Sequence, residues 1–357
     1  MRIAQIAPLY ESVPPQLYGG TERVVSYLTE ELVAQGHEVT LFASGDSQTS
    51  ARLIPSRHRA LRLDGNCVDQ LACHYVMLES VTERAHEFDI LHFHVDYLHF
   101  PFSKRCAVPH LTTMHGRLNI PELAPLHRAF PEAPLVSISM SQRKPLPWAN
   151  WIGNVYHGLP SPTSAPGSGG KNYLAFIGRI AREKRVDRAV EIAVKSGMPL
   201  KIAAKVDPSD REYYEKEIEP LLHHPLVEYI GEISEEHKSA FLGDAYAQIF
   251  PIDWPEPFGL CMIEAMSFGT PTIAFDCGSV SEVLRDGVTG FVVNSVEEAV
   301  EVIPKIASLS RAACRREFDQ RFLASRMAED YVRLYELLAT AESLAVPAPR
   351  LDSSLTL

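Results

Sequence analysis

Short apolar runs alternate with amphipathic stretches along both halves of the chain. In the first half, residues 2–7 and 39–43 are apolar runs typical of buried strands, and residues 21–35 carry apolar side chains at helical spacing. Gly36 stops the helix before the second apolar run. This order of strand, loop, helix and strand predicts a doubly wound α/β domain, which binds ligands beyond the carboxyl ends of its strands.

The alternation restarts after residues 161–170, which are rich in proline, serine and glycine and have the composition of a linker. Residues 173–177 then form a strand-like run, and residues 187–196 show helical spacing. A chain of 357 residues is long enough for two domains with separate cores. We therefore predict one domain over 1–157 and a second over 158–325.

The stretch over 249–276 carries the most informative pattern in the second half. It begins as a strand-like run, breaks at two prolines and resumes as a helix over about 258–268. Glu264 lies inside this apolar helix, where an ionised carboxylate is costly unless donors satisfy it. One interpretation is that Glu264 only pairs with a buried arginine. Glu256, however, precedes the helix next to free backbone N–H groups, and this combination suits a polyhydroxylated, partly anionic ligand.

The same stretch resembles the signature of a known enzyme family. Its sequence E-P-F-G-L-x-x-x-E, with the carboxylates spaced as E-x7-E, is similar to the motif of the retaining nucleotide-sugar glycosyltransferases of family 4, or glycosyltransferase group 1. The resemblance implies the GT-B fold, two Rossmann-like doubly wound domains with an inter-domain cleft. The first domain would bind the acceptor and the second the nucleotide-sugar donor. Glu256 would contact the donor sugar, and Glu264 would hold the ribose hydroxyls.

Two motifs in the first domain fit this resemblance. Gly19 and Gly20 stand directly before a helix, where backbone amides can approach a phosphate or sugar, although a plain turn also explains two glycines. The family has a glycine-rich loop at this place. His115 follows the strand-like run 111–114 and precedes a glycine, and family members carry a donor-contacting histidine in this context. We therefore expect all three residues at the cleft.

The second domain carries two cations that resemble the family's G-R-x4-K-G element. Arg179 and Lys184, placed around one loop, could converge on a diphosphate, although a solvated basic loop is the alternative. Arg185 replaces the usual final glycine, and the sequence after residue 203 departs from the family's G-x-G-P. Ile230 lies in a segment where relatives read the base through backbone groups.

The resemblance implies two overlapping sets of site residues. The catalytic set is His115, Glu256, Arg179 and Lys184. The donor-binding set is Gly19, Gly20, Arg179, Lys184, Ile230, Glu256, Phe258, Gly259, Leu260 and Glu264.

The end of the chain has two parts. Residues 311–340 show helical spacing, as one long helix or a broken one, and Tyr331 and Tyr335 contribute to an apolar face. In GT-B proteins the last helix, here 326–344, crosses back to the first domain. We expect the tail over 345–357 to be disordered.

The run over 89–96 suggests a rival function. His92, His94 and Asp96 alternate as on one face of a strand, and H-x-H-x-D is a metal-ligand spacing in some hydrolases. That function needs further ligands from other strand ends, and the resembled family often has a similar motif without a metal. We find no convincing D-x-D site, so we expect neither a metal nor a cofactor. Arg179, Lys184 and the helix amides would balance the leaving group's charge.

Charge and cysteine usage narrow the partners. The net charge of −11 argues against a nucleic-acid partner. Residues 1–157 hold 13 Lys and Arg against 15 Asp and Glu, net −2, and residues 158–357 hold 21 against 30, net −9. The densest basic run of the first domain, residues 57–62, has only three arginines, which predicts no stable membrane association and a soluble acceptor. Six cysteines without a C-x-x-C pair, and no secretory signal, indicate a cytoplasmic protein.

The resemblance to this family implies a retaining hexosyltransferase. With both carboxylates assigned to hydroxyl binding, none remains for a double displacement, so the resemblance implies a front-face substitution in which the leaving phosphate accepts the acceptor's proton. The alternatives are a GT-B nucleotide-sugar epimerase or hydrolase and a catalytically silent sugar-nucleotide binding protein.

Overall fold

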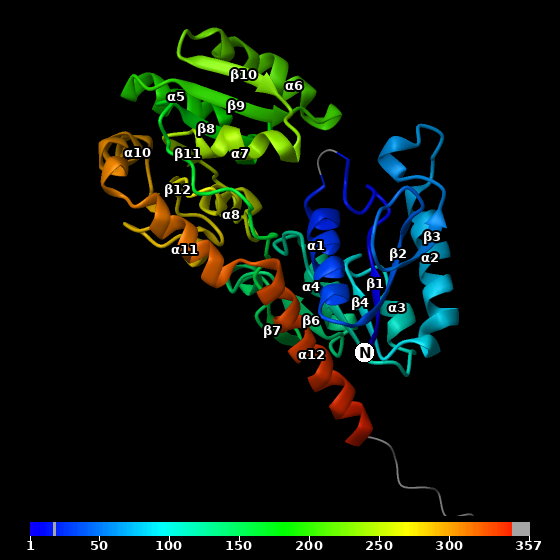
Figure 1. Cartoon of the computed structure of the whole chain (residues 1–357). Coiled ribbons are helices and arrows are strands. Elements are labelled where there is room, and N and C mark those ends of the chain that lie inside the picture. The colour runs from blue at the N-terminus through cyan, green and yellow to red at the C-terminus, as the bar shows by residue number, and fades with distance from the viewer. Residues whose placement is uncertain (17–18, 345–357) are drawn as a thin grey trace, which may run out of the picture.

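The computed structural model describes residues 1–16 and 19–344. Figure 1 shows two α/β units, one from each half of the chain, and a last helix that returns to the first unit. Within these described ranges, every helix is too short or too polar to cross a membrane. The tail that we expected to be disordered, 345–357, lies outside the described residues.

The first unit is built on a seven-stranded sheet in which all neighbouring strands are parallel, in the order β3-β2-β1-β4-β5-β6-β7. The central strand β1 is buried over residues 3–6, because helices cover both faces of the sheet. The strands are β1 (Arg2–Ile6), β2 (Glu38–Ser44), β3 (Arg52–Arg57), β4 (Ile90–Phe93), β5 (His110–Thr113), β6 (Leu135–Ser137) and β7 (Trp151–Asn154).

The second unit has a six-stranded parallel sheet in the order β10-β9-β8-β11-β12-β13. Its strands are β8 (Leu174–Arg179), β9 (Leu200–Lys205), β10 (Val227–Gly231), β11 (Ala247–Phe250), β12 (Thr272–Phe275) and β13 (Gly290–Val293). The prediction of two doubly wound parallel sheets is confirmed.

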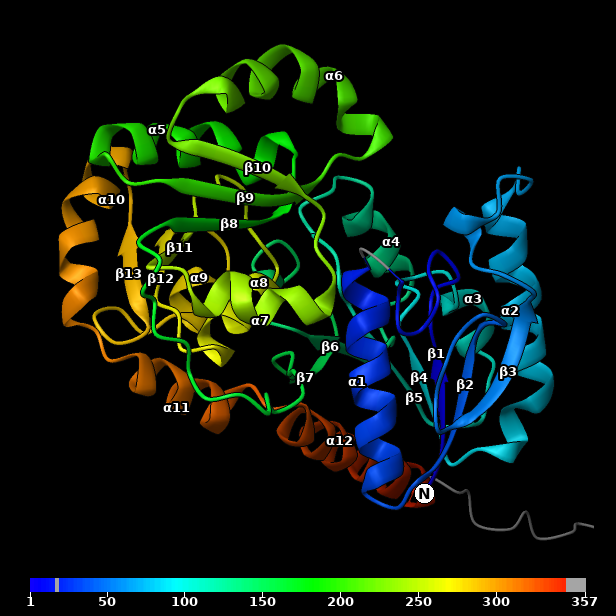
Figure 2. The same ribbon diagram turned by 45° about the horizontal axis from the view of Figure 1, so that its top comes forward.

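Helices cover both faces of the first sheet. Leu28 and Leu32 of α1 share one buried cluster with Tyr331 and Tyr335 of α12, so these two helices lie on the same face. Met77 of α2 belongs to the cluster on the opposite face. Figure 2 shows α12 running beneath α1. The helices are α1 (Gly20–Ala34), α2 (Gln70–Arg84), α3 (Phe100–Ser103), α4 (Leu123–Ala129) and α12 (Ala324–Leu344).

The second sheet is covered in the same way. Val186 of α5 and Ala299 of α10 lie in one core cluster, whereas Met262 of α8 and Phe318 of α11 lie in another. The helices are α5 (Val186–Ser196), α6 (Arg211–Tyr213), α7 (Glu235–Gly243), α8 (Leu260–Ser267), α9 (Val280–Val283), α10 (Val296–Val302) and α11 (Arg311–Arg321).

The chain crosses between the two units twice, and the two crossings lie side by side. The Leu159 N–H donates to the Phe322 carbonyl at 2.9 Å, and the Ala324 N–H donates to the Leu159 carbonyl at 2.8 Å. Gly158 permits this approach, because a Cβ there would lie 2.4 Å from the Leu323 carbonyl oxygen. The units are therefore joined by a paired connection.

One strand was not predicted from the sequence, and the structure decides one alternative that the sequence left open. Strand β3 was missed because its sequence R-L-I-P-S-R is polar and contains Pro55, which is tolerated at the edge of a sheet. The helical region over 311–340 is broken at residues 322–323, where α11 ends and the paired connection begins.

Candidate active site

A cavity of about 340 Å³ lies between the two domains, at the carboxyl ends of their strands. Its volume is in the range typical of small-molecule sites. The first domain contributes Arg23 of α1, and the second contributes Lys205 at the end of β9. Ten of the predicted site residues line the cavity: Gly19, Gly20, His115, Arg179, Lys184, Glu256, Phe258, Gly259, Leu260 and Glu264.

Ile230 is the predicted donor-binding residue that does not line the cavity. It lies on β10 with its side chain exposed, and the register of β10 against β9 shifts between Tyr229 and Gly231. Gly231 has a positive φ of 75°, which turns the chain at the end of the strand. The structure places Glu232 and Ile233, the next two residues, at the cavity instead.

The loop that carries Glu256 is positioned by two glycines. Gly259 begins α8 with a φ of 81°, a left-handed conformation that favours glycine. Gly278 lies against the loop, where a Cβ would come within 2.3 Å of the Glu256 nitrogen. The Ser279 N–H donates to the Glu256 carbonyl at 3.0 Å. These contacts place Glu256 beside the N-terminus of α8.

Lys184 and Glu256 form an ion pair in the cavity wall. The Glu256 carboxylate also accepts a hydrogen bond from the Trp254 indole at 3.0 Å. The Lys184 ammonium lies 4.9 Å from the centre of the Trp254 ring, a cation–π arrangement. Both charged side chains are mostly buried, so the cation is held within the cavity by a carboxylate and an aromatic face.

Arg179 is surrounded by carboxylates. Its guanidinium lies 2.6 Å from Glu183, 3.4 Å from Asp207 and 3.7 Å from Asp210. Burial would raise the pKa of Asp207, but Lys205 and Arg179 outweigh it and lower that pKa. The predicted cations therefore line one cavity with their charges balanced by neighbouring carboxylates.

Glu264 links the two domains. Its Oε1 accepts hydrogen bonds from Arg23 Nη1 at 2.8 Å and from Lys238 Nζ at 2.7 Å. Glu235 completes the network, at 2.8 Å from Arg23 and 2.6 Å from Lys238. Burial would raise the pKa of Glu264, but Lys238 and Arg23 outweigh burial and lower it. Glu264 thus pairs with a buried arginine, as one interpretation held, and also lines the cavity.

A buried hydrogen-bond network reaches the cavity at His115. His115 Nε2 lies 2.9 Å from His94 Nδ1, and His94 Nε2 lies 2.7 Å from Gln5 Oε1. The Gln5 amide nitrogen donates to the Tyr335 hydroxyl at 3.1 Å, and that hydroxyl lies 2.7 Å from His92 Nδ1. The network therefore runs from the cavity through the first sheet to α12.

The network assigns one protonation state to His115. Burial lowers the pKa of His115 to about 3 and that of His94 well below its usual value, so both rings are neutral near pH 7. With the Gln5 amide oriented as in the structure, Gln5 Oε1 accepts the His94 Nε2 proton, and His94 Nδ1 accepts from His115 Nε2. His115 Nδ1, buried and without a partner among the described residues, is then an acceptor.

We predict that Gln5→Leu will remove the preference for His115 protonated on Nε2, because His94 Nε2 loses its acceptor. The change also leaves buried polar groups unsatisfied and should cost about 1–3 kcal/mol of unfolding free energy. The measurement is ¹⁵N NMR of the histidine rings, which reports which nitrogen is protonated. Gln5→Glu keeps an acceptor at this position and is the matched control. A wild-type His115 protonated on Nδ1 would contradict the assignment.

His92 and His94 do not form the metal site that their spacing suggested. Strand β4 ends at Phe93, so the alternation does not extend to Asp96, which has a φ of 49°. Asp96 accepts the His115 backbone N–H, and burial raises its pKa to about 6. All four ring nitrogens of the two histidines have protein partners, and the fourth contact joins His92 Nε2 to Thr113. The described residues contain no group of three metal-ligating side chains.

The sequence interpretation missed several residues at this site. Arg23 and Lys238 hold Glu264, but neither belongs to a motif that we identified. His157 stacks on His115 with ring centres 5.3 Å apart. From the sequence it was identified only as the last residue of the predicted first domain. A basic residue three positions after the glycine pair was the available signal for Arg23.

The sequence matches two family models. Residues 18–159 match Glycosyltransferase Family 4, and residues 164–321 match Glycosyl transferases group 1. Together the two matches span most of both domains.

Individual relatives agree with these matches. A phosphatidyl-myo-inositol mannosyltransferase of Mycobacterium leprae is 25% identical over 391 residues, covering 96% of this chain and 98% of that protein. An uncharacterized 41.2 kDa protein in the cps region of Klebsiella pneumoniae is 27% identical over 170 residues, 46% of each chain. Among solved structures, Anabaena Alr3699/HepE in complex with UDP-glucose has a TM-score of 0.71 and 15% identity, covering 95% of this chain and 100% of that chain. The chain therefore belongs to the glycosyltransferase group 1 family and has the GT-B fold.

Proposed function

We propose that this glycosyltransferase moves a sugar, with retention of configuration and without a metal ion, from a nucleotide-diphosphate sugar to an acceptor hydroxyl. The main observation is the convergence of two cations and two carboxylates in one inter-domain cavity: Arg179, Lys184, Glu256 and Glu264. Cations and helix amides suit a diphosphate, and carboxylates suit sugar hydroxyls.

Each residue has a role in this mechanism. Arg179 and Lys184 stabilise the negative charge that develops on the diphosphate as the glycosidic bond breaks. The amides at the start of α8 add hydrogen-bond donors there, and Glu256 and Glu264 bind hydroxyls of the sugar and the ribose. The acceptor oxygen approaches the face that the diphosphate leaves, and the leaving phosphate takes its proton. His115, which lines the cavity, contacts the bound donor.

The residues that line the cavity and one structural relative support a nucleotide sugar as donor. The Anabaena structure of the same fold holds UDP-glucose. In this chain the carboxylate pair and the cation pair lie within one cavity of about 340 Å³. The first experiment is a thermal-shift panel of nucleoside diphosphates and nucleotide sugars, followed by product analysis of the stabilising donors.

We propose a soluble acceptor. Of the three arginines in residues 57–62, Arg57 is engaged with Asp64 and Arg62 with Glu11, which leaves little free positive charge for an anionic membrane. Vesicles with anionic lipid should therefore leave the protein in the supernatant at physiological salt. Pelleting that is abolished by glutamate at positions 57, 59 and 62 would favour a membrane lipid as acceptor.

Transfer should persist after exhaustive chelation, because protein cations balance the leaving group in the proposed mechanism. The measurement compares initial rates before and after chelator treatment and after addition of Mg²⁺, Mn²⁺ or Zn²⁺. Loss of activity with specific rescue by one ion would contradict this prediction. In the same assay, transfer to an added acceptor supports a transferase, whereas an epimer with free nucleotide indicates an epimerase or hydrolase. An unchanged ligand indicates a binding protein.

A further inference from the structure

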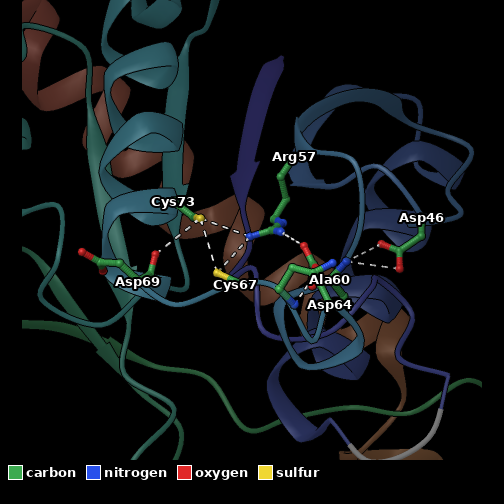
Figure 3. Close-up of polar contacts among 8 residues, drawn as sticks. Asp46, Arg57, Ala60, Asp64, Cys67, Asp69 and Cys73 are labelled. Atoms are coloured by element: carbon green, nitrogen blue, oxygen red, sulfur yellow. Dashed lines mark hydrogen bonds and ion pairs between the residues drawn. The ribbon is translucent and has the colours of Figure 1, made fainter.

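Two cysteine thiols of the first domain lie close together outside the cavity lining (Figure 3). Cys67 precedes α2 and Cys73 lies in its first turns, and their Sγ atoms are 3.9 Å apart. Arg57, at the end of β3, donates to Cys73 Sγ at 3.1 Å and to Cys67 Sγ at 3.4 Å. Figure 3 shows the guanidinium between the two sulfurs and the Asp64 carboxylate. The four side chains form one cluster.

The geometry fits conversion to a disulfide. A disulfide needs a sulfur–sulfur distance of about 2.0 Å, so side-chain rotation and a small backbone shift would close the present gap. Both cysteines are partly exposed, and an oxidant in solution can reach them. Burial and the neighbouring Cys67 thiol raise the pKa of Cys73, and the Arg57 cation offsets this rise only in part.

The same cluster is unsuited to a metal ion. The positive guanidinium of Arg57 donates to both sulfurs and would repel a cation. Among the residues that the structure describes, no three histidine, cysteine or carboxylate side chains are grouped for metal binding. The chemistry left to the cluster is that of two thiols.

We propose that Cys67 and Cys73 are a modification site. The two thiols form a reversible intramolecular disulfide by exchange with a small-molecule disulfide such as oxidised glutathione, which is the oxidant. One protein thiolate attacks a glutathione sulfur, the glutathione S–S bond breaks, and one glutathione thiolate leaves. The second protein thiolate attacks the protein sulfur of this mixed disulfide and releases the other glutathione. The two protein thiols lose two electrons, and their protons end on the two glutathione thiols.

The disulfide would act on a segment that contacts the loop between β1 and α1. Leu61 and Arg62 lie in the segment that joins β3 to Cys67. The Leu61 N–H donates to the Leu9 carbonyl at 2.9 Å, and the Arg62 N–H donates to the Tyr10 carbonyl at 3.0 Å. These carbonyls belong to the loop between β1 and α1, and this loop ends at Gly19 in the cavity wall. Constraining Cys67 therefore constrains the segment that supports this wall.

The test treats the reduced full chain with millimolar oxidised glutathione, alkylates it under denaturing conditions and measures its mass. Both cysteines lie in one tryptic peptide, residues 63–84, which should lose two hydrogen masses. The number of alkylated thiols should fall by two from the six present, and dithiothreitol should restore it. Only glutathione adducts, or an unmodified peptide, would overturn the proposal.

Variants separate this pair from the other thiols. Cys67→Ser and Cys73→Ser should each prevent the internal disulfide and retain one glutathione, whereas Cys106→Ser, a partly exposed control, should react as wild type. Arg57→Met should slow the reaction about tenfold relative to Arg57→Lys, which keeps the charge. Equal rates for these two variants would show that the charge of Arg57 does not assist disulfide formation.

Hydrogen exchange tests the connection to the cavity wall and does not depend on catalysis. Exchange of the Leu61 and Arg62 amides should be slower in the oxidised protein than in the reduced protein, since both amides belong to the constrained segment. Unchanged exchange at both amides would overturn the coupling between the disulfide and the loop.

Discussion

Replacing Lys184 with alanine should lower kcat/KM by about 30- to 1000-fold, equivalent to roughly 2–4 kcal/mol of transition-state stabilisation. The Lys184 ammonium faces the cavity, and the proposed leaving diphosphate becomes more negative as the reaction proceeds. The variant also leaves the Glu256 carboxylate beside the site without this cation, with the Trp254 indole as a remaining donor. Steady-state kinetics over a range of donor concentrations gives the effect on kcat and KM.

Arg182→Ala is the matched control for the Lys184 prediction. Arg182 belongs to the same basic loop, but its side chain is 68% exposed and pairs with Glu217 outside the cavity. Its loss should change kcat/KM by less than about twofold, because exposed ion pairs contribute little. A folded Lys184→Ala variant with wild-type kinetics would show that this lysine does not stabilise the leaving group.

Acidification from pH 7 to pH 5.5 should lower the unfolding free energy by roughly 5–7 kcal/mol. Five buried histidines each contribute about 1.4 kcal/mol of this loss, because pH 5.5 is about one unit below the pKa of a histidine in the unfolded chain. Burial lowers the pKa of these histidines in the folded protein, so the unfolded chain binds protons first as the pH falls. Their contribution is therefore complete above about pH 6.5 and is lost as the pH falls towards the folded pKa. The five histidines are His92, His94, His99, His115 and His157.

Urea unfolding at several pH values measures this slope. His99→Asn should make the slope shallower by about one proton, since His99 is buried between Ser103 and Thr112. His237→Asn removes an exposed histidine and is the control for the substitution itself. Asp96 acts in the opposite direction, because burial raises its pKa, and burial also raises the pKa of Glu22, Glu31 and Asp210. An unfolding free energy that does not change between pH 7 and 5.5 would contradict the prediction.

The parts of the site that lie close together in the sequence were predictable. Glu256 lies just before α8 and Glu264 lies inside it, so their spacing alone indicated that both belong to the same helix and the turn before it. The cavity also contains Lys184, which was inferred from its place in a strand-end loop. Parallel strands bring their carboxyl ends to one edge of a sheet. Motifs that follow different strands were therefore expected to lie in one common cleft.

The remaining parts depend on contacts between distant segments. Arg23 is 241 positions from Glu264, and their pairing requires the relative placement of both domains. Gln5 reaches His94 and Tyr335 only because β1 lies beside β4 and under α12. Ile230 was misplaced by a local irregularity of β10, which no pattern of apolar positions reports. Sequence patterns identify the faces of elements, whereas these contacts are set by packing.

The paired connection between the domains has a mechanical consequence. A single flexible crossing would let one domain rotate about any axis relative to the other. Here two crossings are bonded to each other through Leu159, so a twist about the length of the connection would break its hydrogen bonds to Phe322 and Ala324. Bending across the pair leaves those bonds intact, as in a flat hinge. The paired connection therefore resists twisting between the domains more than it resists bending.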